Sequence, residues 1–155
     1  MNRFHIVWIL FLITHLFTVE AAIAENIVKH TGDGAIYVRL IGFDNNHGKA
    51  IIALVNNKDG FAIENSPIPP AKSAAATINS NGAEYLFEEV PYGEYSVQVF
   101  HDENSNGEMD SNFLGMPKEA YGFSNNVRGT LSPPSFDDAS FILDKKRITI
   151  TIKVE

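Results

Sequence analysis

Apolar and polar residues alternate with a period of two along much of the chain. In residues 35–43, Ile36, Val38 and Leu40 fall on one face of an extended segment, and the residues between them fall on the other. Residues 147–155 repeat the pattern, with apolar residues at every second position. Because successive side chains of a β-strand point to opposite sides, both segments are predicted to be strands with one buried face.

Further strands are predicted where short apolar runs lie between turn residues such as glycine, asparagine and proline. One run, residues 73–79, is rich in alanine and would permit a helix, but its shortness favours a strand. No stretch after the N-terminal segment has an apolar stripe at helical spacing. About seven short strands within residues 25–155 predict an all-β fold, namely a single antiparallel β-sandwich. The remaining predicted strands are residues 49–57, 83–90, 94–102 and 139–144.

Residues 103–138 depart from this pattern and are predicted to form one long irregular connection. Connections of this length in a small domain are usually functional, or are held in place by specific contacts. This part of the chain is therefore expected either to carry a functional site or to be held in place by specific contacts.

The N-terminal 24 residues have the features of a secretory signal peptide: a short basic end, an apolar run and the small-residue site Ala22-Ile23-Ala24. We expect cleavage after Ala24, which leaves residues 25–155 as a single domain without a transmembrane segment. An uncleaved anchor is the alternative, but His15 and Glu20 interrupt the run before it reaches the roughly 20 apolar residues that span a bilayer. The protein is expected to be exported, either periplasmic or secreted.

The formal net charge is −7, from 19 acidic and 12 basic residues. A nucleic-acid partner is not expected, because phosphate binding requires a basic surface, and the chain has no polybasic patch for anionic lipids. It also has no cysteine, which excludes disulfides, thiolate zinc sites, cysteine nucleophiles and iron–sulfur clusters. An acidic surface suits a soluble protein that binds cations.

The segment HDENSNGEMD, residues 101–110, has the spacing of a calcium-binding loop. Such a loop turns side-chain oxygens inward at positions 1, 3 and 5 and has glycine at position 6. It adds a backbone carbonyl at position 7 and a further ligand at position 9. The neighbouring oxygens favour a hard cation over the transition metal that His101 alone would suggest. The predicted metal ligands are Asp102, Asn104, Asn106, Glu108 through its carbonyl, and Asp110.

The match to an EF-hand ends at position 12, where Phe113 replaces the bidentate glutamate, and the segment before the loop has the pattern of a strand. The missing ligand would come from Asp137 or Asp138, or from a carbonyl or amide in residues 111–126. With few carboxylates, the affinity is expected to lie in the millimolar to submillimolar range of extracellular modules. The alternative is a hairpin turn at Asn106-Gly107 that binds no metal.

The order of motifs resembles an uncharacterised bacterial family, domain of unknown function 2141. The resemblance covers nearly the whole chain after the signal peptide and is most specific from Tyr85 to Phe141. It implies an immunoglobulin-like or prealbumin-like β-sandwich outside the cytoplasm, and it implies no established activity, so no catalytic residue can be transferred. The motifs are Pro-x-Gly at 91–93, His-Asp-x-Asn-x-Asn-Gly at 101–107, Gly-x-Pro at 115–117, Tyr-Gly-Phe-Ser-Asn at 121–125 and Pro-Pro-x-Phe-x-x-Ala at 133–139.

The aromatic part of the connection, residues 113–136, supports two interpretations. Its aromatic rings can pack the connection onto the edge of the sandwich, or they can form a small-ligand or carbohydrate cleft with nearby polar groups. The residues of such a cleft would be Tyr121, Phe123, Asn125 and Arg128.

An enzyme is not expected. His101, Asp102 and Ser124 are residue types found in hydrolases, but adjacent strand positions point His101 and Asp102 to opposite faces. The chain has no Gly-x-Ser-x-Gly, His-Glu-x-x-His or glycine-rich phosphate motif. The sequence thus predicts an exported, non-catalytic β-sandwich, stabilised by calcium, that binds an unidentified protein or other envelope component. The alternative is a small-ligand or carbohydrate-binding module that uses the aromatic loop.

Overall fold

The computed structural model describes residues 32–62, 67–130 and 132–155. Residues Asp33–Glu155 form one unit by their mutual contacts. The predicted signal peptide, residues 1–24, lies outside the described residues. None of the helices in the described part of the chain combines the length and the hydropathy needed to span a bilayer.

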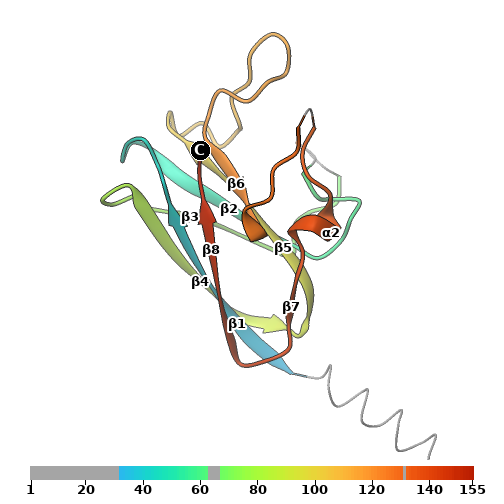
Figure 1. Cartoon of the computed structure of the whole chain (residues 1–155). Coiled ribbons are helices and arrows are strands. Elements are labelled where there is room, and N and C mark those ends of the chain that lie inside the picture. Colours follow the sequence, from blue (N-terminus) through green and yellow to red (C-terminus); the bar gives the residue numbers. More distant parts are fainter. Residues whose placement is uncertain (1–31, 63–66, 131) are drawn as a thin grey trace, which may run out of the picture. The chain divides into compact units, whose positions relative to one another are not determined.

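Two β-sheets make up the unit (Figure 1), and together they contain eight strands in the described residues. The smaller sheet has the order β4-β1-β8, and the larger has the order β3-β2-β5-β6, with β7 also paired to β5. The smaller sheet comprises β1 (Asp33–Ile41), β4 (Gly82–Pro91) and β8 (Arg147–Lys153). The larger comprises β2 (Lys49–Val55), β3 (Lys72–Ala76), β5 (Gly93–Asp102), β6 (Tyr121–Phe123) and β7 (Phe141–Leu143).

The predicted all-β sandwich is confirmed, with eight strands where about seven were expected. Most neighbouring strands are antiparallel, but β1 and β8 pair in parallel from Ala35 opposite Arg147 to Ile41 opposite Lys153. The parallel pair arises because β7 lies in the larger sheet and the chain then crosses to the smaller sheet, where β8 runs beside β1. The strand predicted at 139–144 is shorter, because Ala139 belongs to a helix.

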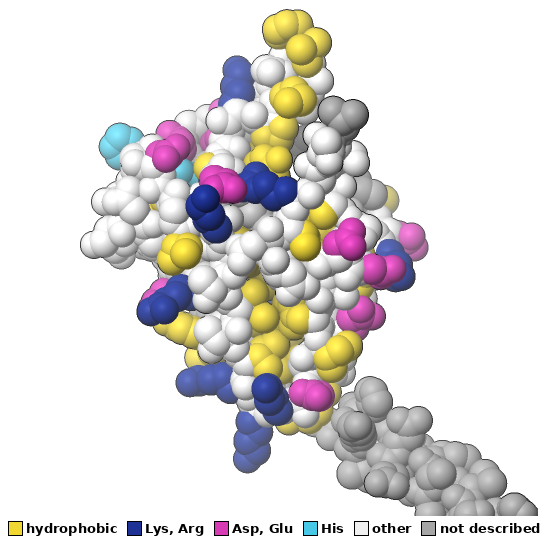
Figure 2. All heavy atoms as spheres, in the orientation of Figure 1, with side chains coloured by type: hydrophobic (Ala, Val, Ile, Leu, Met, Phe, Trp, Pro, Cys, Tyr) yellow, Lys and Arg dark blue, Asp and Glu magenta, His cyan; other side chains and the backbone are white. Residues whose placement is uncertain are grey.

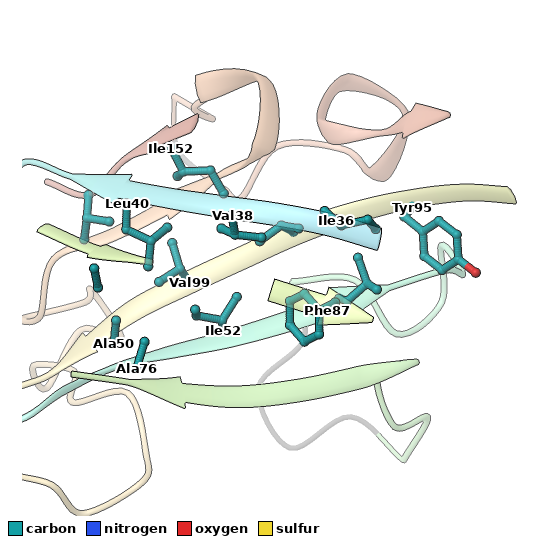
Figure 3. Packing of buried hydrophobic residues seen from close by; sticks show 14 of the residues in the cluster. Ile36, Val38, Leu40, Ala50, Ile52, Ala76, Phe87, Tyr95, Val99 and Ile152 are labelled. Atoms are coloured by element: carbon teal, nitrogen blue, oxygen red, sulfur yellow. The ribbon is translucent and has the colours of Figure 1, made fainter. Parts of the chain in front are cut away.

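The alternation of apolar residues accounts for the core between the two sheets (Figure 3). Ile36, Val38 and Leu40 on β1 are 0–1% exposed, and they face Ile52 of β2 and Val99 of β5 in one buried cluster. The intervening β1 residues are partly or fully exposed. One face of each sheet therefore supplies the core between the sheets. The opposite face of the larger sheet is partly covered as well, since Val55 and Ser96 on that face are 1% and 0% exposed.

The long connection contains more regular structure than its sequence indicated. β6 pairs with β5, a 3-10 turn η1 spans Ser124–Asn126, and helix α2 spans Phe136–Ala139. The helix begins after Ser135, whose side chain accepts a hydrogen bond from Asp138 N and so caps the first turn. The prediction of one irregular segment over 103–138 was therefore too coarse.

Aromatic residues of the connection form a second, smaller core at the end of the larger sheet. The ring of Phe61 lies 5.5 Å from Phe123 and 5.7 Å from Phe136, between centroids. Val55 and Ala139 complete this cluster. The packing fixes the later part of the connection, so that both ends of the segment between Asp102 and Tyr121 are held by the sandwich.

Candidate functional site

The candidate site begins where β5 ends, at Asp102. The Asp102 side chain is only 3% exposed, and its two oxygens accept hydrogen bonds from the backbone N–H groups of Asn106 and Gly107, both at 3.0 Å. The backbone of Gly48 lies against Asp102 so closely that a Cβ at residue 48 would overlap the Asp102 carbonyl. The first carboxylate of the loop is therefore held firmly by the sheet and by its own turn.

The next polar side chains of the loop fold over the same turn. Asn104 Oδ1 accepts from Asn106 N at 3.0 Å, and Asn106 Oδ1 accepts from Glu108 N at 2.8 Å. The Nδ2 groups of Asn104 and Asn106 donate to the carboxylate of Asp110 at 2.8 and 3.3 Å. The structure thus brings Asp102, Asn104, Asn106 and Asp110 together at one turn, whereas Glu108 takes part through its backbone N–H.

A further carboxylate that the sequence analysis missed, Glu119, closes the base of this loop. Its Oε1 accepts from Glu103 N and its Oε2 from Asp110 N, each at 3.0 Å. The residue is 7% exposed, so this bidentate contact ties both ends of the loop in a shielded place. The sequence alone could have indicated this residue, because Glu119 is the one carboxylate in residues 111–126, the segment expected to supply a further ligand.

Asp137 and Asp138, the carboxylates suggested as the missing ligand, have other partners. Asp137 binds Lys58 at 2.6 Å, and the hydrogen bond between them raises the pKa of Lys58. The carboxylate of Asp138 accepts from Ser135 Oγ at 2.6 Å at the start of α2. Capping of α2 and pairing with Lys58 thus engage both carboxylates at the helix, and no hydrogen bond from either to the loop is seen among the described residues.

The donor set of the loop fits a hard cation. Its side chains offer only carboxylate and amide oxygens, the ligand type that calcium prefers, and an amide or carboxylate oxygen that accepts one N–H retains a second lone pair. Among the described residues, no group of three or more His, Cys, Asp or Glu side chains is arranged to hold a metal ion. A cation site at this loop would therefore need the amide oxygens of the asparagines as ligands. A site with so few carboxylates is expected to bind its cation with modest affinity.

His101 lies beneath the loop and is fully buried. Its Nε2 is 2.8 Å from the backbone oxygen of His47, its Nδ1 is 3.6 Å from Glu103 Oε1, and its ring meets Phe43 edge-on at 5.1 Å. Ser124 is also buried, and its hydroxyl donates to Ala139 O at 2.5 Å and accepts from Val97 N at 2.9 Å. The two side chains thus have separate structural partners.

The four residues of the predicted aromatic cleft are divided between packing and the surface. Phe123 belongs to the small core, and Asn125 Nδ2 donates to the backbone oxygens of Asp138 and Ser140 at 3.0 and 2.8 Å. Arg128 lies over the Tyr121 ring, 4.9 Å from its centroid. Of the four residues, only Tyr121 and Arg128 therefore place an aromatic ring and a polar group next to each other for a ligand.

A hollow of about 400 Å³ lies beside Arg128, between the connection and the outer end of β8. Arg128 Nε binds Glu155 at 3.2 Å within it. A hydrogen bond from Lys153, with additional attraction from Arg128, lowers the pKa of Glu155. The two basic groups that border the hollow are thus already partnered by a carboxylate.

Comparison with known proteins places the chain in a family. A family model described as an uncharacterised protein conserved in bacteria, domain of unknown function 2141, matches residues 38–151. The chain belongs to this family. The matched range of domain 2141 includes the whole candidate loop, Glu119 and the aromatic connection. No curated protein and no solved structure matched the chain.

Proposed function

We propose that this member of the domain 2141 family is an exported, non-catalytic β-sandwich that takes up calcium at residues 102–110 and binds a protein or other component of the cell envelope. The proposal of export rests on the signal-peptide pattern of residues 1–24. The observation that carries the proposal of calcium binding is the convergence of four oxygen-bearing side chains on one turn, whose two ends Glu119 ties together.

Each residue has a distinct part in this proposal. Asp102, Asn104, Asn106 and Asp110 would hold the ion, and Glu119 positions the backbone at both ends of the loop. A bound calcium ion would supply positive charge among neighbouring acidic groups. Because the loop starts at the end of β5 and Glu119 stands two residues before β6, cation binding would stabilise the segment that joins these two strands.

Thermal unfolding with and without calcium tests the proposal. At a free calcium concentration one hundred times the dissociation constant, binding to the folded state adds about 2.7 kcal/mol to the free energy of unfolding, so the Tm should rise relative to the same protein in chelator. Asp110→Asn keeps the size of the side chain but removes its charge, and it should reduce this rise.

Asp137→Asn is the matched control, because Asp137 pairs with Lys58 away from the loop. It should leave the calcium-dependent rise intact. Equal Tm values in calcium and in chelator, with no heat of binding in calorimetry at millimolar calcium, would leave residues 102–110 as a polar turn and overturn the proposal.

The hollow beside Arg128 favours a second candidate, a module that binds a small ligand or carbohydrate through the aromatic loop. Tyr121 and Arg128 supply an aromatic face and a cation there. Phe123 and Asn125 are engaged in packing and in backbone hydrogen bonds. The calcium-dependent sandwich is therefore preferred, because more of its proposed ligands are gathered at one place.

A further inference from the structure

An apolar loop tip stands out beyond the candidate cation loop (Figure 1). Directly after Asp110 the chain runs outward and returns through residues 111–117, here called the apolar tip. Phe113, Leu114 and Met116 are 93%, 72% and 60% exposed, the highest exposures among the large hydrophobic side chains of the described residues. Figure 2 shows the hydrophobic atoms gathered at this extremity. Exposed apolar clusters of this kind mark sites of interaction.

The apolar tip is held in shape by its own hydrogen bonds. Asn112 Oδ1 accepts from the N–H groups of Leu114 and Met116 at 2.9 and 3.0 Å. The Asn112 backbone oxygen accepts a hydrogen bond from Gly115 N at 2.9 Å, and the Asn112 N–H donates to Met116 O at 2.8 Å. Gly115 has φ of +75°, a conformation that glycine adopts without strain. Four backbone N–H groups of the tip are thus satisfied internally, which lowers the cost of moving them into an apolar medium.

The size of the apolar tip favours a lipid surface over a protein interface. Three side chains of this size expose roughly 400 Å² of apolar surface, about half of the roughly 800 Å² that each partner contributes to a standard protein interface. Reversible attachment to a bilayer requires only a small apolar insertion. A second copy is disfavoured because a symmetric contact would bring two acidic loops together, each with Asp102, Glu103, Glu108 and Asp110.

We propose that the apolar tip inserts Phe113, Leu114 and Met116 into the interfacial region of a lipid bilayer. Lys118, the basic residue at the base of the tip, is exposed and able to reach a headgroup phosphate while its stem follows the apolar surface. This names a lipid surface as the envelope component of the proposed function. Insertion into a neutral bilayer does not depend on calcium. Attachment to an anionic bilayer does, and that dependence rests on the proposed function, because the acidic loop repels anionic headgroups unless a cation offsets its charge.

A tryptophan placed in the tip reports on insertion. Trp8 is the one tryptophan of the sequence and lies in the predicted signal peptide, so Phe113→Trp gives the exported protein a single reporter. With phosphatidylcholine vesicles its fluorescence should shift to the blue, both in calcium and in chelator. Ile142→Trp, at a position 58% exposed on β7, is the control and should show no shift.

Loss of the apolar side chains should abolish attachment. The variant F113S/L114S/M116S should lower binding in vesicle co-sedimentation by more than about tenfold, with an unchanged Tm, because these side chains lie outside both cores. Vesicles that also contain phosphatidylglycerol should bind wild-type protein more strongly in calcium than in chelator.

Equal vesicle binding by the wild type and the triple serine variant would overturn the inference. Absence of lipid binding would also overturn it. Dimers that the serine variant abolishes would then indicate a second copy as the occupant of the tip, and cross-links from the tip to another protein would indicate a protein partner. A calcium-independent blue shift on phosphatidylcholine would support insertion even if calcium failed to raise the Tm, so the failure of one proposal is distinguishable from the failure of the other.

Discussion

At the scale of single residues, Tyr95 shows how burial couples a titratable group to folding. Its side chain is 5% exposed, and its hydroxyl donates to the backbone oxygen of Pro91 at 2.9 Å. Burial, with a smaller contribution from the charge of Asp33, raises the pKa of Tyr95 above its ordinary value of 10.0. The folded state therefore holds the phenolic proton to a higher pH than the unfolded state does.

The raised pKa of Tyr95 predicts a loss of stability in alkali. As pH rises past 10.0 the unfolded chain releases the proton while the folded chain retains it, so the free energy of unfolding falls through this range. The Tyr95→Phe variant lacks this hydrogen bond, so its free energy of unfolding near neutral pH should be lower than that of the wild type by about 1 kcal/mol. Because the variant has no phenol to titrate, its free energy of unfolding should decline less than that of the wild type between about pH 9 and pH 11. Urea unfolding at several pH values measures this, and parallel declines for both proteins would contradict it.

At the scale of elements, β1 is specified by its alternation of side chains. Ile36 is fully buried between the sheets, whereas Ile41, at the other end of the same strand, is 46% exposed. Both belong to the smaller sheet and have the same side chain. Burial of one face therefore determines the register of the strand, since a slip by one residue would expose the whole apolar set.

Truncation of these two isoleucines tests the alternation directly. Ile36→Ala removes buried methyl and methylene groups and leaves a cavity, so it should lower the free energy of unfolding by about 2–5 kcal/mol. Ile41→Ala should cost less than about 1 kcal/mol because much of its side chain is already in water. Chemical denaturation of both variants provides the comparison, and equal losses would show that β1 is not buried on one face.

At the scale of the whole Asp33–Glu155 unit, the two sheets meet along one edge. The backbones of Tyr121 and Glu155 exchange hydrogen bonds at 3.3 and 3.2 Å, and Asn126 bonds to the backbone of β8 at Thr151 and Lys153. Gly122 permits this approach, since a Cβ there would lie 2.5 Å from the Lys153 oxygen. The strand inside the long connection thus joins the larger sheet to the smaller.

Gly122→Ala should therefore weaken the join between the sheets. Overpacking against the backbone of β8 is expected to cost about 1–3 kcal/mol in the free energy of unfolding. Gly93→Ala is the control on β5, because a Cβ there meets only ordinary contacts, 3.4 Å or more away, and it should change the stability by less than about 0.5 kcal/mol. A Gly122→Ala protein as stable as Gly93→Ala would refute the steric argument.

The sequence by itself determined the features that depend on neighbours along the chain. Alternation located most of the strands, including the buried face of β1, because the period of two follows from strand geometry alone. It did not reveal the three-residue strand β6. The spacing of Asp102, Asn104, Asn106 and Asp110 indicated which side chains would meet, because a tight turn gathers alternate positions. Ser135 capping α2 is a similarly local feature, although the helix was too short for its periodicity to reveal it.

Only the tertiary structure decided which distant residues meet. It placed Glu119 rather than Asp137 or Asp138 at the candidate loop, ran β8 parallel to β1, and paired the short β6 with β5. These contacts join segments that are separated along the chain, so no local period encodes them. The strand pairings form because the two sheets bury their apolar faces against each other. The positions of the carboxylates then depend on which backbone N–H groups or lysines lie within hydrogen-bonding distance.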